Sequence, residues 1–221
     1  MQAFTYSKPA SVADAVKALG GGDVKLLAGG QTLLTSMKLG LAAPEALVDL
    51  GGIAELKGIT VGKDSVRVGA MCTHAEVAAD AGVAKAIPAL AKLASNIGDR
   101  QVRNRGTIGG SLANNDPAAC YPAAVLGLGA TIQTNQRTIA ADDFFTGLYE
   151  TALKNGELIT AVSFPVPEKA GWQKFKQPAS RFSLVGVFVS KGPQGTRVAV
   201  TGAGPCVFRV KALEDKLAAD W

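Results

Sequence analysis

The sequence predicts an α+β fold, built as one large domain or two small ones. Strand and helix patterns alternate over the first 50 residues, and two later stretches have the pattern of antiparallel hairpins. Of the 221 residues, 48% are hydrophobic and 19% are charged, as in globular chains with a buried core. The 26 glycines indicate many tight turns and close backbone approaches.

The first 50 residues alternate short apolar runs with stretches of helical spacing. The predicted elements are strands at residues 3–6, 24–28 and 46–50 and helices at residues 12–19 and 33–39. Ser11 is the expected N-cap of the first helix, and Gly20-Gly21-Gly22 ends it. Gly29 and Gly30 separate the second strand from the second helix, which ends at Gly40.

The middle of the chain begins with a predicted hairpin and continues as helices. Thr73 and Glu76 form a capping-box pattern, and Pro88 is expected to kink or split the helix over residues 83–94. Residues 95–115 are glycine- and polar-rich without a clear period, so we expect an irregular, functional segment. The other predicted elements are strands at residues 59–61, 66–69, 131–134 and 157–164 and helices at residues 118–128 and 142–145.

Composition changes after Pro167. Residues 183–191 and 196–201 read as a hairpin around Gly192-Pro193-Gln194-Gly195, followed by an amphipathic helix over residues 207–221. Two strands and one helix bury little area, so this C-terminal segment is expected to be incomplete by itself.

Composition and isolated residues exclude several kinds of protein. The apolar content excludes disorder, and the longest apolar run, of 11 residues at 122–132, is too short to span a membrane. The N-terminus lacks the pattern of a signal peptide. Cys72, Cys120 and Cys206 form no C-x-x-C pair, which favours the reducing cytoplasm. The single histidine, His74, has no neighbouring ligand type, so a metal site is not expected.

Two glycine loops are the candidate binding motifs. In residues 26–33 a strand runs through Gly29-Gly30 into a helix, which exposes backbone N–H groups suited to phosphate oxygens. In residues 103–112 a second Gly-Gly pair lies between Thr107 and Ser111, and Asn114 and Asp116 follow. Two such loops indicate a diphosphate held from both sides, as in a dinucleotide. The alternatives are a plain tight turn, and an N-cap with an Asx-turn and no ligand.

Other candidate sites are weaker. Arg100, Arg103 and Arg105 could contact a nucleic-acid backbone, but no aromatic residues alternate with them and the net charge is only +5. We therefore expect either a solvated loop or arginines paired internally, and no nucleic-acid partner. Asp142-Asp143 is interpreted as a helix start, and no acid, base or nucleophile constellation is evident.

The two loops carry a resemblance to a known family. The motifs A-G-G-Q-T-L at 28–33 and Q-V-R-N-R-G-T-I-G-G at 101–110, within the longer stretches 26–59 and 97–126, resemble the FAD-binding medium subunits of molybdenum hydroxylases. That family includes carbon monoxide dehydrogenase and xanthine dehydrogenase. The resemblance implies the vanillyl-alcohol-oxidase/MurB (PCMH) type of fold. This fold consists of two α/β FAD-binding subdomains, at 1–57 and 58–170, followed by a small C-terminal α+β domain at 171–221. The C-terminal domain is expected to be incomplete, because family members continue further.

The resemblance also implies which residues bind FAD. In this sequence they are Leu26, Leu27, Ala28, Gly29, Gly30, Gln31, Thr32, Leu33, Ile97, Thr107, Ile108, Gly109, Gly110, Ser111, Asn114, Asp116, Ile159 and Lys176. The first eight and residues 107–111 match the two diphosphate loops, whereas Ile97 and Ile159 match apolar positions near the flavin. One departure is Cys120, where many members carry an aspartate. If that aspartate holds a cofactor hydroxyl, Asp116 or a backbone group substitutes here.

The function implied is that of an electron-transfer subunit. FAD in this chain would take electrons from 2Fe–2S clusters of a small partner subunit and pass them to an external acceptor. A large partner subunit would carry the molybdopterin cofactor, in a cytoplasmic dimer of heterotrimers. The absence of cysteine clusters here is consistent with iron–sulfur centres on another chain. The alternatives are a stand-alone FAD oxidoreductase of the same fold and a non-redox module that binds a nucleotide or diphosphate metabolite.

Overall fold

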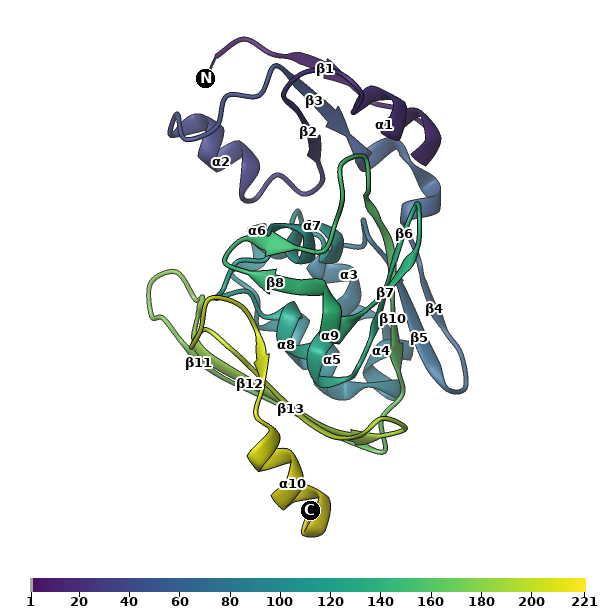
Figure 1. Cartoon of the computed structure of the whole chain (residues 1–221), viewed down its shortest axis with the longest axis vertical. Helices are drawn as coiled ribbons and strands as arrows, with labels where there is room; N and C mark the ends of the chain where they lie inside the picture. Colours follow the sequence, from purple (N-terminus) through teal and green to yellow (C-terminus); the bar gives the residue numbers. More distant parts are fainter. Residues whose placement is uncertain (1) are drawn as a thin grey trace.

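The computed structural model describes residues 2–221, which form three successive units (Figure 1). The first unit contains a three-stranded parallel sheet of order β1-β3-β2, flanked by two short helices. Its elements are β1 (Thr5–Ser7), α1 (Val12–Ala18), β2 (Val24–Leu27), α2 (Leu33–Lys38) and β3 (Ala46–Asp49), followed by 3-10 turns at Leu50–Gly52 and Ala54–Leu56. Ser11 caps α1 by accepting the N–H of Asp14, which confirms the predicted helix start.

The second unit is an antiparallel sheet of order β4-β5-β10-β6-β7, with helices on one face. Its strands are β4 (Ile59–Val61), β5 (Ser65–Gly69), β6 (Thr131–Thr134), β7 (Thr138–Ala140) and β10 (Ile159–Pro165), with a small ribbon of β8 (Phe145–Gly147) and β9 (Glu150–Thr151). Its helices are α3 (His74–Ala79), α4 (Ala81–Ala86), α5 (Pro88–Ser95), α6 (Arg100–Arg103), α7 (Ile108–Asn114), α8 (Tyr121–Gly127) and α9 (Ala141–Phe144).

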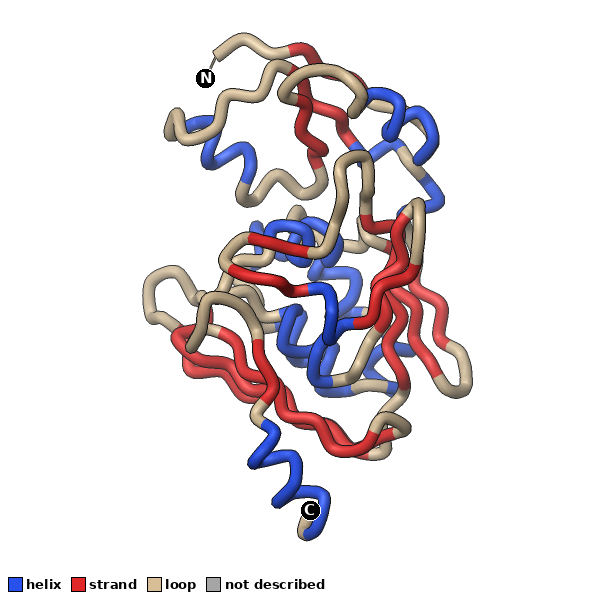
Figure 2. Tube along the Cα trace, viewed as in Figure 1, coloured by secondary structure: helices blue, strands red, loops and turns tan. Residues whose placement is uncertain are grey.

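The third unit is a four-stranded antiparallel sheet of order β11-β12-β13-β14. It contains β11 (Lys169–Lys176), β12 (Ser183–Gly192), β13 (Gly195–Thr201), β14 (Phe208–Arg209) and α10 (Lys211–Ala219). Figure 2 shows helices of the second unit between the five-stranded and four-stranded sheets. Helices α5 and α8 contact the third unit, and α7 contacts β5 and β10. The main core therefore spans the second and third units.

Most predicted elements are confirmed, including the hairpins, the Thr73 capping box and the separation of α4 from α5 at Pro88. Residues 95–115 contain two short helices, α6 and α7, so the expectation of a wholly irregular segment is wrong. Asp99 and Thr107 each cap one of them by accepting a backbone N–H three residues ahead. Helices of four and seven residues are too short to show a periodic pattern, and their caps are the only local signal.

The C-terminal prediction also needs correction, because the sheet has four strands rather than two. Strand β11 pairs along nearly the whole of β12, and β14 is only two residues long. The C-terminal helix begins at Lys211 rather than at residue 207. It is held by Glu214, which accepts the Val198 N–H at 2.9 Å and pairs with Arg209 at 2.7 Å. None of the helices described in residues 2–221 has the length and apolar character needed to cross a bilayer.

Candidate functional site

A cavity of about 620 Å³ lies where the first unit meets the other two. All three units contribute to its wall: the β2–α2 connection from the first, residues 97–120 and 153–159 from the second, and the tip of the β11–β12 hairpin from the third. Volumes of about 300–1,000 Å³ are usual for small-molecule and cofactor sites. The cavity is therefore large enough for an extended organic cofactor.

One wall is the first glycine loop, between β2 and α2. Gly30 has a φ of +72°, a backbone conformation that favours glycine. Among residues 2–221, the backbone N–H groups of Gly29 to Leu33 have no hydrogen-bond acceptor, and the Thr32 side chain does not cap α2. Successive unsatisfied N–H groups at a helix start attract an anion. This loop can therefore hold phosphate oxygens.

The second glycine loop packs directly against the first. A Cβ atom on Gly29 would lie 2.2 Å from the carbonyl oxygen of Arg105 and 2.7 Å from the Cα of Gly106. A Cβ atom on Gly110 would lie 3.4 Å from that of Ala28. Only glycine at position 29 lets the two loops approach this closely. Both loops also line the same cavity, and the prediction that they hold one ligand from both sides stays a prediction.

The second loop differs from the first in how its N–H groups are used. Ile108 and Gly109 donate to the carbonyls of Cys72 and Ala70, at 3.1 and 2.8 Å, and Gly110 donates to the Thr107 hydroxyl. These bonds fix the loop against the end of β5. The Ser111 hydroxyl donates no hydrogen bond within residues 2–221 and lines the cavity. The second loop can therefore contribute side-chain hydroxyls and close backbone contact more than N–H donors.

The polar segment after α7 combines both interpretations left open by the sequence. Asp116 makes an Asx-turn, because its Oδ1 accepts the Ala118 N–H at 2.8 Å, yet it also lines the cavity. Asn114 lines the cavity as well and makes no side-chain hydrogen bond within residues 2–221. Arg103 donates to the carbonyls of Ile97 and Gly98 at 3.1 Å, so one of the three arginines braces the cavity wall from within the protein.

Apolar side chains line the wall near β10. Leu153, Leu158 and Ile159 all face the cavity, and Ile97 joins them from the connection between α5 and α6. Apolar walls with a few fixed polar groups are typical of sites for planar organic cofactors. This wall is suited to an aromatic ring system.

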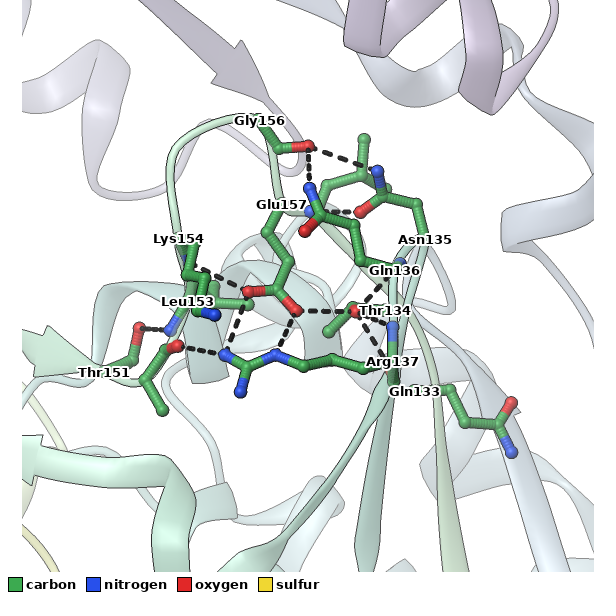
Figure 3. A network of polar contacts seen from close by, with 12 residues as sticks. Gln133, Thr134, Asn135, Gln136, Arg137, Thr151, Leu153, Lys154, Gly156 and Glu157 are labelled. Atoms are coloured by element: carbon green, nitrogen blue, oxygen red, sulfur yellow. Dashed lines mark hydrogen bonds and ion pairs between the residues drawn. The ribbon is translucent and has the colours of Figure 1, made fainter.

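An ion pair between the buried carboxylate of Glu157 and the exposed Arg137 supports the apolar wall (Figure 3). Glu157 accepts from the Arg137 side chain at 2.9 and 3.1 Å, from the Thr134 hydroxyl at 2.8 Å and from the Lys154 N–H at 2.9 Å. These donors, the Arg137 guanidinium first among them, lower the pKa of Glu157 to about 2. The carboxylate is thus held charged and fixes the turn before Leu158.

The structure brings most of the predicted site residues together. Fifteen of the eighteen line the cavity: Leu26, Ala28, Gly29, Gly30, Gln31, Thr32, Leu33, Ile97, Thr107, Gly109, Gly110, Ser111, Asn114, Asp116 and Ile159. Leu27, Ile108 and Lys176 do not line it. Ile108 is fully buried in the core, and Lys176 is exposed at the end of β11. Lys174, two residues earlier on the same strand, lines the cavity instead.

Sequence reasoning missed several lining residues, among them His74, Glu157 and Lys174. The imidazole of His74 is 5% exposed, and its Nδ1 has no hydrogen-bond partner within residues 2–221. Burial, with a smaller contribution from the positive charge of Arg103, lowers its pKa to about 4. The side chain is therefore neutral at pH 7. Among the described residues no group of three His, Cys, Asp or Glu side chains is placed to hold a metal ion.

Open N–H donors, a glycine contact between two loops and an apolar wall define a protein that binds a dinucleotide cofactor with an aromatic ring system. Comparison with known proteins makes this specific. The sequence profile described as "FAD binding domain in molybdopterin dehydrogenase" matches residues 2–167, well over half of the chain. The chain belongs to this family, which confirms the resemblance carried by the two glycine motifs.

Comparisons with individual relatives support the same family assignment. The nicotine 6-hydroxylase medium subunit of Paenarthrobacter nicotinovorans is 38% identical, over 98% of this chain and 81% of that one. The carbon monoxide dehydrogenase medium chain of Hydrogenophaga pseudoflava is 37% identical, over 97% and 79%. A carbon monoxide dehydrogenase structure from the same organism superposes with a TM-score of 0.91 at 36% identity, covering 97% of this chain and 79% of that one. The predicted FAD-binding α+β fold and the class of oxidoreductase subunit are confirmed.

Proposed function

We propose that this chain is the FAD-carrying electron-transfer subunit of a molybdenum hydroxylase. It would take electrons from 2Fe–2S clusters of a small subunit and pass them to an external acceptor. The observation that carries the proposal is the contact of two glycine loops across a cavity in a chain of this family. When bound, FAD would supply the redox chemistry, accepting two electrons and releasing them again.

The residues of this chain would bind and orient FAD. The N–H groups of Gly29 to Leu33 would hold the diphosphate from one side, and Thr32 and Ser111 would add hydroxyl donors from both loops. Asn114 and Asp116, next along the chain, would bind hydroxyls of the ribityl or ribose groups. The fit rests on the open N–H donors, which no acceptor within residues 2–221 satisfies.

The apolar wall would receive the isoalloxazine. Ile97 and Ile159 would contact the ring, and Leu153 and Leu158 would exclude water beside it. Because Glu157 is held by four hydrogen bonds, the turn before Leu158 would keep its place when the cofactor binds. Lys176 stays a predicted contact, although it lies outside the cavity wall.

The absorption spectrum of the purified chain tests the cofactor. We expect flavin absorption bands, and chromatography of the heat-released cofactor should identify FAD. A colourless chain that also fails to take up added FAD would contradict the proposal and favour a non-redox module for a nucleotide or diphosphate metabolite. A flavin-containing chain that binds no iron–sulfur or molybdopterin subunit would favour a stand-alone oxidoreductase.

The partner subunits and the oligomeric state of the complex are further parts of this proposal. Relatives are named as medium subunits or chains, and the carbon monoxide dehydrogenase from Hydrogenophaga pseudoflava is described as lacking the Mo-pyranopterin moiety of its molybdenum cofactor. We propose a large molybdopterin subunit, a small 2Fe–2S subunit and a cytoplasmic dimer of heterotrimers. Light scattering on the co-expressed complex should give the mass of two copies of each subunit. Boundaries near residues 57 and 170, between the three sheets, are the proposed domain limits.

A further inference from the structure

Lys174 places a positive charge in the cavity wall without a carboxylate beside it. Its Nζ donates to the carbonyl oxygen of Asn96 at 2.9 Å and to the thiol sulfur of Cys120 at 3.2 Å. Within residues 2–221 it takes part in no salt bridge. A carbonyl and a thiol, the latter a weak acceptor, position an ammonium group without cancelling its charge as a carboxylate does.

Most other charged groups in the cavity wall are already engaged. Glu157 is bound by Arg137, and Lys25 lies 3.1 Å from the carboxylate of Asp23. Asp116 uses one oxygen in its Asx-turn, and Arg181 lies on the exposed tip of the β11–β12 hairpin. Lys174 is half-buried on β11, where its charge is screened less by water than that of an exposed side chain.

The position of Lys174 is fixed by segments far apart in the sequence. Asn96 directly precedes Ile97, so its carbonyl holds the ammonium group beside the wall that we propose for the isoalloxazine. Cys120 is 4% exposed and lies directly before α8, with its sulfur 3.6 Å from the Ser183 hydroxyl on β12. The thiol therefore lies between Ser183 and Lys174, and Lys174 lines the cavity.

We propose that Lys174 favours the reduced form of the bound flavin and that Cys120 is the positioning residue for Lys174. This inference rests on the proposed FAD binding. Reduction by two electrons from the partner's clusters, with uptake of one proton from water, adds one negative charge to the isoalloxazine. An adjacent cation without a carboxylate partner stabilises that charge. Lys174 thus raises the reduction potential of the flavin in this chain.

The test is a spectroelectrochemical titration of the purified, FAD-loaded chain. Cys120→Asp places a carboxylate against Lys174, whereas Cys120→Ser keeps a neutral acceptor and is the matched control. We expect Cys120→Asp to weaken binding of reduced relative to oxidised FAD about tenfold, which lowers the potential by about 30 mV for two electrons. Lys174→Gln, which removes the positive charge, should lower the reduction potential by a similar amount. Lys174→Arg, which keeps the charge, should not.

Each possible outcome of this titration either supports the proposed role of Lys174 or overturns it. Unchanged potentials in both Cys120→Asp and Lys174→Gln, with FAD bound, would overturn it and leave the proposed function standing. If Cys120→Ser lowers the reduction potential as much as Cys120→Asp does, the introduced carboxylate is not the cause, and the proposed effect of the Lys174 charge is overturned. If Cys120→Asp does not retain FAD, the difference between Lys174→Gln and Lys174→Arg decides. A wild-type chain that binds no FAD would overturn the proposed function, and this inference with it.

Discussion

Replacing Gly29 by alanine should separate the two glycine loops and weaken FAD binding. The added Cβ would lie 2.2 Å from the Arg105 carbonyl oxygen, whereas ordinary contact begins at 3.4 Å, so the loops must move apart by 3.4 − 2.2 = 1.2 Å. Overpacking of this kind costs about 1–3 kcal/mol. At about 1.4 kcal/mol per tenfold change, affinity for FAD should fall by about 5- to 150-fold.

Flavin fluorescence quenching on titration of the FAD-free chain measures this loss. Gly21→Ala is the matched control, because no atom lies within 4 Å of its added Cβ and its φ is not positive. Gly110→Ala should lower the affinity for FAD by an amount between those of Gly21→Ala and Gly29→Ala, since its Cβ would lie 3.0 Å from the Thr107 hydroxyl. Wild-type affinity in Gly29→Ala, or an equal loss in Gly21→Ala, would refute the assignment of these loops to the cofactor.

Three further predictions concern the buried titratable side chains of Glu157, His74 and Glu214. Because the folded pKa of Glu157 is about 2 against 4.5 unperturbed, its contribution to stability is complete above pH 4.5 and is lost as pH falls toward 2. Arg137→Gln should flatten the pH dependence of Tm in that window, and an unchanged slope would contradict the assignment. His74, the single histidine, should show no NMR titration between pH 8 and 5.5 in the folded chain, whereas the denatured chain titrates near 6.5. Glu214→Ala should remove one of the two carboxylates paired with Arg209 and the acceptor of the Val198 N–H, and lower Tm by several degrees, measured by calorimetry, with Asp215→Ala as the neighbouring control.

The glycine loops could be predicted from sequence because their signal is local. A strand, two glycines and a helix start follow one another within eight residues, and Gly30 takes the positive φ that favours glycine. Contacts such as Lys174 with Cys120, or Arg137 with Glu157, join residues 54 and 20 positions apart. Pairings of this kind depend on how the sheets assemble, which no local pattern records.

The lysines of β11 show where a regular pattern fails. In an undisturbed strand, Lys174 and Lys176 would face the same side, because side chains alternate with a period of two. The pairing of β11 with β12 shifts register between Phe175 and Lys176, because Leu184 of β12 is an extra residue with no partner on β11. Lys174, before the shift, lines the cavity, and Lys176, after it, is exposed. A bulge of one residue cannot be read from the sequence, so no local pattern showed that Lys174 lines the cavity; the cofactor contact of Lys176 stays a prediction.

The start of β10 explains how the cavity stays aligned between units that each have their own sheet. Glu157 is locked to Arg137 within the second unit. The next residue, Leu158, is buried in the core of the first unit, and Ile159 is buried in the main core. Successive side chains of an extended chain point to opposite sides, so two neighbouring residues can belong to two cores. Because all three also line the cavity, any shift between the first and second units must move the cavity wall with it.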